Sequence, residues 1–174
     1  MNMLELIQSR RSCRIFSEQS VEESKIETLL KAALWSPTSK NNRPWEFVVV
    51  DDKQLIEQLS LSKPHGAEFL KGAPLAIVVV ADPSKSDVWV EDTAIAAMLI
   101  QLTAEDIGLG SCWIQTRLRD HANGSSSSDC VKKLLAIPDS YEVASVIALG
   151  YKAKERKPYA DDTLLWNKVH RNQF

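Results

Sequence analysis

The chain has 174 residues, of which 44% are hydrophobic and 25% charged, so it can bury a core as one domain without disulfides or metal ions. Its 21 Lys+Arg and 23 Asp+Glu give a formal net charge of −2. This balance excludes the strongly basic surface of a nucleic-acid binder. We therefore expect a single domain over residues 1–174, in which any bound anion is held by a local cluster of cations.

The sequence offers no segment for export or for spanning a membrane. Met1 to Arg14 lacks the apolar region and cleavage site of a signal peptide. The longest apolar run, Ala94 to Ile100, is far shorter than the ~20 residues that cross a bilayer. Cys13, Cys112 and Cys130 form no Cys-x-x-Cys pair, and their odd number argues against a disulfide framework. We expect a cytoplasmic protein without a membrane partner.

Hydrophobic periodicity predicts helices and strands in the first half of the chain. Ile26, Leu29 and Ala33 recur at helical spacing, and Ser36-Pro37 ends that helix. Trp45–Val50 and Leu75–Ala81 are apolar, β-branched runs typical of buried strands. In chain order we predict a short helix from Leu4 to Arg11, an extended segment at 12–16, a helix at 21–34, a loop at 38–43, a strand at 45–50, a helix at 54–61 and a strand at 75–81.

The second half continues with a long helix from Asp92 to Ile107, which Gly108 ends. Its continuous apolar run predicts a helix covered on nearly all sides. We then predict a strand at 111–116, a helix at 129–136 and a strand at 141–149. Because strands and helices do not alternate strictly, this order favours an α+β domain with two layers.

The tail from Tyr151 to Phe174 carries apolar side chains without a strong period. It includes Leu164, Leu165 and Trp166, which need a surface to pack against. A second subunit would provide that surface, so we predict a homodimer.

Several catalytic motifs are absent from the sequence. Gly108-Leu109-Gly110 is followed by Trp at position 113, where a dinucleotide fingerprint needs Gly. There is no P-loop, His-Glu-x-x-His or Gly-x-Ser-x-Gly motif. His65, His121 and His170 lack metal-ligand spacing, so we predict no metal site.

The first cluster that suggests binding chemistry is Arg10-Arg11-Ser12-Cys13-Arg14. Guanidinium groups match phosphate because they offer a planar fork of donors. The alternative is that the arginines only complement the dipole at the end of a helix. Cys13 fits a small packed residue, although the neighbouring cations could lower its pKa.

The second cluster is the polar loop from Ser36 to Trp45, which two prolines stiffen. Its hydroxyls, amides and backbone groups can hydrogen-bond a ligand. The alternative is a simple connector, since Ser, Thr, Asn and Pro are ordinary turn residues.

Taken together and in this order, these elements resemble the FMN-dependent nitroreductase family. The family opens with Arg-Arg-Ser-x-Arg-x-Phe, here Arg10 to Phe16, followed by Ser-Pro-Ser-x-x-Asn-x-Gln-Pro-Trp-x-Phe, here Ser36 to Phe47. A Gly-Leu-Gly-x-x-Trp-Ile element matches Gly108 to Ile114, and a strand ends at Gly150-Tyr151. The resemblance covers nearly the whole chain.

The resemblance implies a mixed, mostly antiparallel sheet of four to five strands flanked by helices. It also implies a homodimer in which the C-terminal tail extends onto the partner subunit and FMN binds at the interface. One subunit would contribute Arg10, Arg11, Ser12 and Arg14; its partner would contribute Pro37, Thr38, Ser39 and Asn41; and Ile114, Gln115, Gly150 and either Arg156 or Lys157 would complete the site.

The implied activity is hydride transfer from NAD(P)H to flavin N5 and then to a small acceptor such as a nitroaromatic or quinone, by a ping-pong mechanism. Arg10 and Arg11 would lie near the phosphate, and Arg14 near N1/O2, where a cation stabilises the reduced flavin. Ile114 and Gln115 would line the N5 side. No catalytic side chain is required, because the cofactor carries the redox chemistry.

This sequence departs from the family pattern at two positions of the loop. Arg43 replaces the common Gln and adds a cation, while Thr38 replaces Ser and keeps the hydroxyl. The alternative function is a non-catalytic protein of the same fold that stores or senses FMN.

Overall fold

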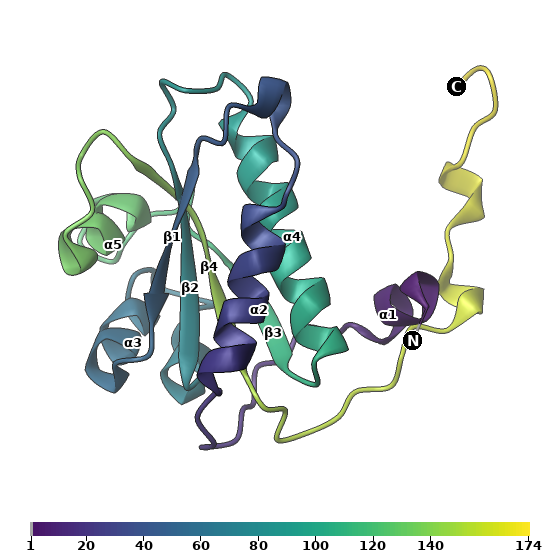
Figure 1. Ribbon diagram of the computed structural model, residues 1–174, viewed down its shortest axis with the longest axis horizontal. Helices are drawn as coiled ribbons and strands as arrows, with labels where there is room; N and C mark the ends of the chain where they lie inside the picture. Colours follow the sequence, from purple (N-terminus) through teal and green to yellow (C-terminus); the bar gives the residue numbers. More distant parts are fainter. Residues whose placement is uncertain (1) are drawn as a thin grey trace.

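A computed structural model describes residues 2–174 of the protein. Its centre is a sheet of four strands in the order β1-β2-β4-β3, with every neighbouring pair antiparallel (Figure 1). The strands are β1 (Trp45–Val50), β2 (Leu75–Ala81), β3 (Gly110–Gln115) and β4 (Glu142–Gly150). The short segment at 12–16 adds isolated bridges at the β3 edge, including a parallel one between Ser12 and Ser111. The predicted sheet is confirmed.

Helices cover both faces of this sheet. On one face lie α2 (Glu23–Leu34) and α4 (Trp89–Asp106); on the other lie α3 (Lys53–Ser60), α5 (Ser127–Leu135) and the short 3₁₀ helix η2 (Glu68–Gly72). The domain therefore has three layers, and the predicted two-layer arrangement is wrong. The reason is that β2 and β4 are buried on both faces.

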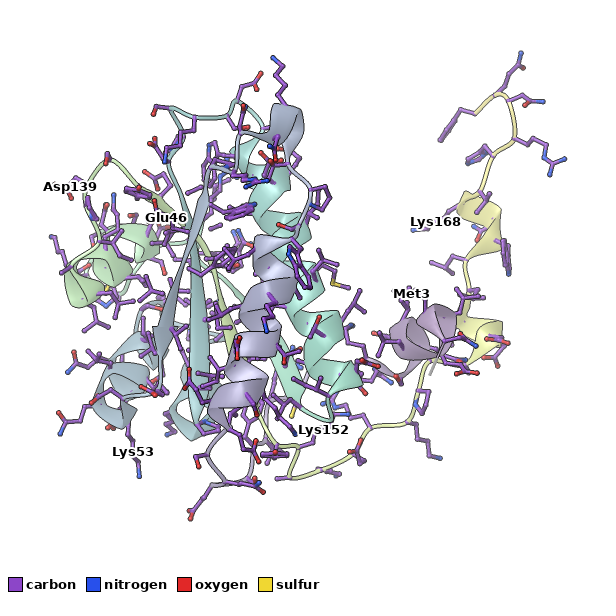
Figure 2. The ribbon with its side chains drawn as sticks, in the orientation of Figure 1. Met3, Glu46, Lys53, Asp139, Lys152 and Lys168 are labelled. Atoms are coloured by element: carbon purple, nitrogen blue, oxygen red, sulfur yellow. The ribbon has the colours of Figure 1, made fainter. Side chains whose placement is uncertain are left out.

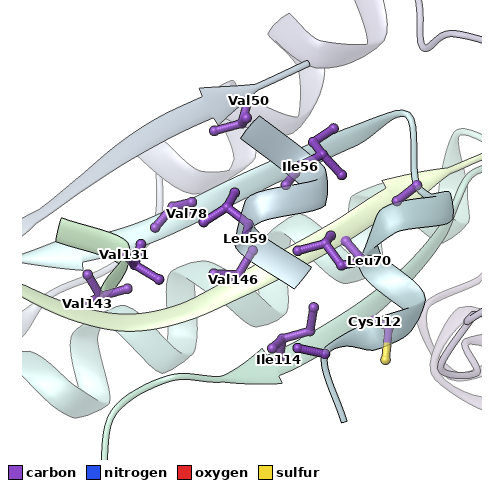
Figure 3. Close-up of a cluster of buried hydrophobic side chains, with 14 of the residues drawn as sticks. Val50, Ile56, Leu59, Leu70, Val78, Cys112, Ile114, Val131, Val143 and Val146 are labelled. Atoms are coloured by element: carbon purple, nitrogen blue, oxygen red, sulfur yellow. The ribbon is translucent and has the colours of Figure 1, made fainter. Parts of the chain in front are cut away.

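The alternation of side chains along β2 divides the core into two parts. Ile77 and Val79 pack against α2 and α4. Val78 and Val80 point the other way and pack with α3 and α5, as Figure 3 shows for Val78 beside Leu59. Because successive strand residues face opposite sides, the continuous apolar run at 75–81 is the sequence signature of this doubly covered strand.

Side-chain caps set the start of several helices, although α2 and α4 begin without one. Asn2 and Glu5 form a capping box at the start of α1 (Met3–Ser9). The side chain of Ser126 accepts a hydrogen bond from the Asp129 amide, so α5 begins two residues earlier than predicted. Helix α4 also starts three residues early, while Gly108, with φ of +81°, follows its end as predicted.

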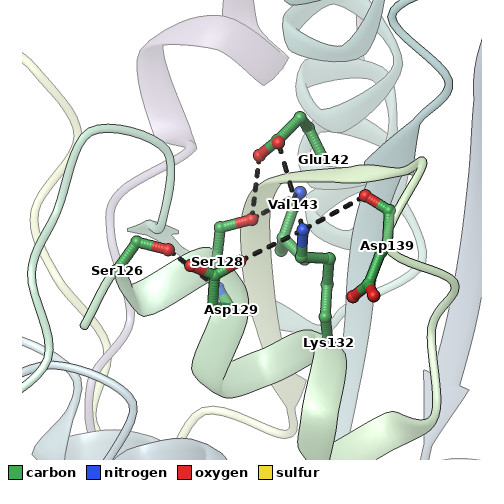
Figure 4. Close-up of polar contacts among 7 residues, drawn as sticks. All are labelled: Ser126, Ser128, Asp129, Lys132, Asp139, Glu142 and Val143. Carbon is green, nitrogen blue, oxygen red and sulfur yellow. Dashed lines mark hydrogen bonds and ion pairs between the residues drawn. The ribbon is translucent and has the colours of Figure 1, made fainter.

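A buried lysine ties α5 to the sheet. The Lys132 ammonium lies 3.1 Å from an Asp129 carboxylate oxygen and 4.0 Å from Glu142 in β4 (Figure 4). It also donates a hydrogen bond to the carbonyl of Asp139 at 3.4 Å. These groups satisfy one another, so we assign the cluster a structural role.

One side of α4 is uncovered in the single chain. Ile95 is 42% and Met98 39% exposed, so the predicted all-round coverage of this helix is wrong for one chain. The sheet, α2 and α1 contact other parts of this helix and leave Ile95 and Met98 exposed. No helix among residues 2–174 is long and apolar enough to cross a membrane.

The C-terminal tail leaves the domain. After β4 the chain runs along α1 and then away from the sheet (yellow in Figure 1), through the 3₁₀ helices η3 (Asp161–Thr163) and η4 (Trp166–Lys168). Leu165 is 61% and Trp166 71% exposed, although both are large apolar side chains. The tail therefore presents an apolar surface that is left exposed by the described part of its own chain, residues 2–174.

Candidate functional site

The arginine-rich segment is held between β3 and the start of the tail. The Cys13 amide donates to the carbonyl of Ser111 at 2.8 Å, and the Ala153 amide donates to the carbonyl of Ile15 at 3.0 Å. Phe16 forms an antiparallel bridge with Lys152. Residues far apart in sequence thus run side by side, and their side chains meet.

Gly110 allows this segment to approach the sheet closely. A Cβ atom at position 110 would lie 2.7 Å from the Cβ of Cys13 and 2.8 Å from the Cγ of Lys152. Cys13 itself is buried, as the sequence predicted. Burial raises the pKa of its thiol and outweighs the lowering effects of the Ile15 carbonyl and the Lys152 charge. Cys13 is therefore a packing residue.

The segment and the tail enclose a cavity of about 190 Å³ rich in cations. Its lining contains five Arg or Lys side chains and one Glu. The lining residues are Ser9, Arg11, Ser12, Cys13, Arg14, Ile15, Lys152, Lys154, Glu155 and Arg156. Such a set of guanidinium, ammonium and hydroxyl donors matches a phosphate group.

Lys152 is oriented by two carboxylates. Its ammonium lies 2.8 Å from Glu105 at the end of α4 and 3.5 Å from Glu155. Burial alone lowers the pKa of Lys152, but the hydrogen bond and charge of Glu105, together with Glu155, raise it overall. The side chain is therefore charged at neutral pH. In Figure 2 it lies where the tail leaves the domain.

The charged residues predicted to bind FMN, together with Ser12, fall into two groups. Arg11, Ser12, Arg14 and Arg156 line the cavity, whereas Arg10 and Lys157 do not. The backbone carbonyl of Lys157 instead accepts a hydrogen bond from the Arg11 guanidinium at 2.6 Å.

Gly150, a predicted site residue, lies outside the cavity lining, which instead contains two residues that the sequence analysis missed. Gly150 pairs with Gly110 and packs on Pro74, where a Cβ atom would lie 2.5 Å from the proline ring. Lys152 and Lys154 line the cavity but were not predicted. The long-range pairing of Phe16 with Lys152 brings both lysines to the cavity, and no local sequence pattern predicts this pairing.

The second predicted cluster forms a tight loop after α2. It contains the 3₁₀ helix η1 (Ser39–Asn41), in which Lys40 and Asn41 have positive φ. The Thr38 hydroxyl oxygen accepts from the Arg43 amide at 3.1 Å, and Arg43 Nε donates to Asn41 Oδ1 at 2.9 Å. Arg43, the departure from the family pattern, thus orients the amide of Asn41.

Ile114 and Gln115 end β3. Ile114 is 1% exposed and packs in the core, so its backbone is the part that can face a ligand. The Gln115 side chain accepts from Trp113 Nε1 at 2.9 Å and donates to the carbonyl of Arg117 at 2.8 Å. Its amide is fixed within the chain.

The cation cavity and the loop lie at opposite ends of α4. Ser39 in the loop bonds Asp92 in the first turn of α4, whereas Lys152 in the cavity bonds Glu105 in the last turn. At about 1.5 Å per residue, these 13 residues separate the two ends by about 20 Å. Within one chain, the two predicted parts of the site are therefore separated by most of the length of α4.

The protein is thus a three-layer α+β domain with an arginine-lined cavity beside its sheet. Comparison with known proteins shows to which family such a domain belongs. The family model for the nitroreductase family matches residues 7–62 and 57–151. A putative NADH dehydrogenase/NAD(P)H nitroreductase from Archaeoglobus fulgidus is 36% identical, with 98% of both chains covered. This chain belongs to the nitroreductase family, and the predicted family is confirmed.

Solved structures agree on the fold. An FMN-dependent nitroreductase from Clostridium difficile R20291 superimposes with a TM-score of 0.97 and 46% identity, covering 99% of this chain and 100% of that one. A putative NADH dehydrogenase/NAD(P)H nitroreductase from Parabacteroides distasonis gives a TM-score of 0.90 and 31% identity over the whole of both chains.

Proposed function

We propose that this protein is an FMN-dependent oxidoreductase that takes hydride from NAD(P)H and passes it to a small acceptor such as a nitroaromatic or quinone. The observation that carries the proposal is the cavity lined by Arg11, Ser12, Arg14, Lys152 and Arg156. An FMN phosphate carries about −2 charge near neutral pH, and several cations are needed to offset its desolvation. A chain of net charge −2 that gathers five cations around one cavity fits this ligand.

FMN, when bound, supplies the hydride chemistry, so the side chains have to bind, orient and exclude water. Arg11 and Ser12, with Arg156 from the tail, hold the phosphate end. Arg14 provides a fixed positive charge for the pyrimidine edge of the ring, where negative charge gathers on reduction. Pro37, Thr38, Ser39 and Asn41 cover the ring.

The site requires two chains. Because the loop lies about 20 Å from the cavity of its own chain, the loop that covers each ring belongs to the partner subunit. The uncovered apolar surfaces support this homodimer: Trp35 beside the loop is 80% exposed, Ile95 on α4 is 42% exposed, and Trp166 on the tail is 71% exposed. Burying them in a second subunit removes apolar area from water.

NAD(P)H and the acceptor use the same open face in turn, which is a ping-pong mechanism without a separate nicotinamide domain. We expect the protein to work in the reducing cytoplasm, since Cys13, Cys112 and Cys130 are all unpaired.

The test is a visible absorption spectrum of the purified protein, followed by anaerobic addition of NAD(P)H and then of a nitroaromatic or quinone. We expect a yellow protein whose flavin band disappears with NAD(P)H and returns with the acceptor. Bound FMN that NAD(P)H does not reduce would favour the storage or sensor alternative. A colourless protein that takes up no added FMN would contradict both functions.

A further inference from the structure

The loop that follows α2 has an unfavourable backbone conformation. Lys40, Asn41 and Arg43 have φ values of +50°, +57° and +48°, a region that L residues other than Asn and Asp rarely adopt. Three such residues within four positions persist only where neighbouring contacts hold them. A residue outside the loop must therefore hold it in place.

Hydrogen bonds within the loop account for part of the restraint. The Asn42 amide donates to the Ser39 carbonyl at 2.9 Å, and the Arg43 amide donates to the Thr38 hydroxyl at 3.1 Å. These bonds define the shape of the loop but do not fix it to the domain. At the centre of the loop, the Ser39 amide donates to Oδ1 of Asp92 at 2.9 Å, and this bond connects the loop to α4.

The surroundings of Asp92 hold its carboxyl group in a fixed orientation. It lies in the first turn of α4 and is 2% exposed, and its second oxygen accepts a hydrogen bond from the Ser86 hydroxyl at 3.0 Å. Ser86 is itself 4% exposed. Among residues 2–174 no basic side chain pairs with Asp92, so its two oxygens are satisfied by the Ser39 amide and the Ser86 hydroxyl. A buried carboxylate without a cation is costly, and packing alone does not explain it.

Resting on the proposed function, we infer that Asp92 is a positioning residue. Its carboxylate, oriented by Ser86, holds the Ser39 amide and thereby keeps the strained loop in the shape that covers the flavin ring bound by the partner subunit. Pro44 and Trp45 anchor the end of the loop, but residues 37–43 are partly or fully exposed. Helix α4 packs on the sheet and on α2, so the Ser39–Asp92 bond ties this middle part of the loop to the core. The residue acts on the site without contacting the ligand.

The experiment compares Asp92→Ala with Asp92→Asn. The asparagine keeps an oxygen for the Ser39 amide and can donate to Ser86, so it should preserve the loop. The alanine should weaken FMN binding about tenfold or more, because the Ser39 amide loses its hydrogen-bond acceptor. Glu91→Gln, an exposed neighbour on the same helix turn, is the matched control and should leave binding unchanged.

Two readouts separate positioning from general stability. The first is hydrogen–deuterium exchange of the peptide at 36–43 in FMN-free protein, which should be faster in Asp92→Ala than in the wild type and Asp92→Asn. The second is the absorption spectrum of flavin at saturating FMN, which should change only in the alanine variant. Should that variant fail to fold, Ser86→Ala should show the same increase in exchange and a smaller loss of affinity.

The inference would be overturned if Asp92→Ala had the exchange rates and the flavin spectrum of the wild type. If only Ser86→Ala folds, the same result in that variant would overturn it. The proposed function would then stand, because the wild type would still bind FMN and react with NAD(P)H. A wild type that binds no FMN would overturn the proposed function and this inference together.

Discussion

The contact between Gly110 and Cys13 determines how closely the arginine-rich segment lies against the sheet. The absence of a side chain at 110 lets the Cys13 amide reach the Ser111 carbonyl and lets Lys152 pass over the same point. The donors of the cavity then come from the segment after α1 and from the start of the tail rather than from one loop. Their spacing depends on packing at a single residue.

Gly110→Ala should therefore damage both stability and FMN binding. The new methyl group would overlap Cys13 and Lys152, which we expect to cost about 1–3 kcal/mol as for overpacking elsewhere. Urea unfolding measures the first effect and titration with FMN the second. Gly72→Ala is the control, since no atom lies within 4 Å of its added Cβ and its φ is not positive. Equal stability and affinity in the two variants would contradict this assignment.

Prediction from sequence reached Arg11, Ser12, Arg14 and Arg156 because a family motif or a basic tail marks them. It missed the tail lysines of the cavity, because their position depends on pairing between the two ends of the chain. It also could not find Asp92. An acidic residue in the first turn of a helix is ordinary, and only the fold shows that it is buried against the loop.

At the scale of elements, the C-terminal tail is fixed to α1 but leaves large apolar side chains exposed in a single chain. The Tyr159 amide donates to the Gln8 carbonyl, and the Arg11 guanidinium lies 4.2 Å from the Tyr159 ring centroid, so the tail is tied to α1 at its beginning. Beyond that point Leu165 and Trp166 extend without cover. An element fixed at one end and apolar at the other is suited to wrap a partner subunit.

Trp166→Asp should weaken the dimer. Loss of a buried aromatic anchor costs about 2 kcal/mol or more at interfaces, and the new charge adds a desolvation cost. Sedimentation of the variant over a range of concentrations should show monomers where the wild type is dimeric, with FMN lost in parallel. Leu61→Asp, which replaces an isolated leucine that is 65% exposed after α3, should remain dimeric. An unchanged dimer in Trp166→Asp would refute the role of the tail.

The helices and strands themselves were largely predictable, and the two errors about layers and about the cover of α4 share one cause. Apolar runs marked β1, β2 and α4, and Gly108 marked the end of α4. The number of layers and the cover of α4 were wrong because an apolar run shows that a surface avoids water but not which partner covers it. For Ile95 and Met98 that partner is absent from the single chain.

At the scale of the whole molecule, the two halves of the site lie at opposite ends of α4, about 20 Å apart. A chain with an acidic balance concentrates its cations at one end and its strained polar loop at the other. We propose that neither half holds and covers a flavin alone, and that two identical chains exchange halves so that each completes the site of the other.

Subunit complementation tests this claim most directly. Arg14→Glu places a negative charge in the cavity, and Asn41→Trp disrupts the loop, so each homodimer should bind FMN poorly. After the two variants are unfolded together and refolded, half of the dimers should be hybrids in which one site has both an intact cavity and an intact loop. We expect FMN binding to return to about one quarter of all sites. A mixture that binds no more FMN than the separate variants would contradict a site shared between subunits.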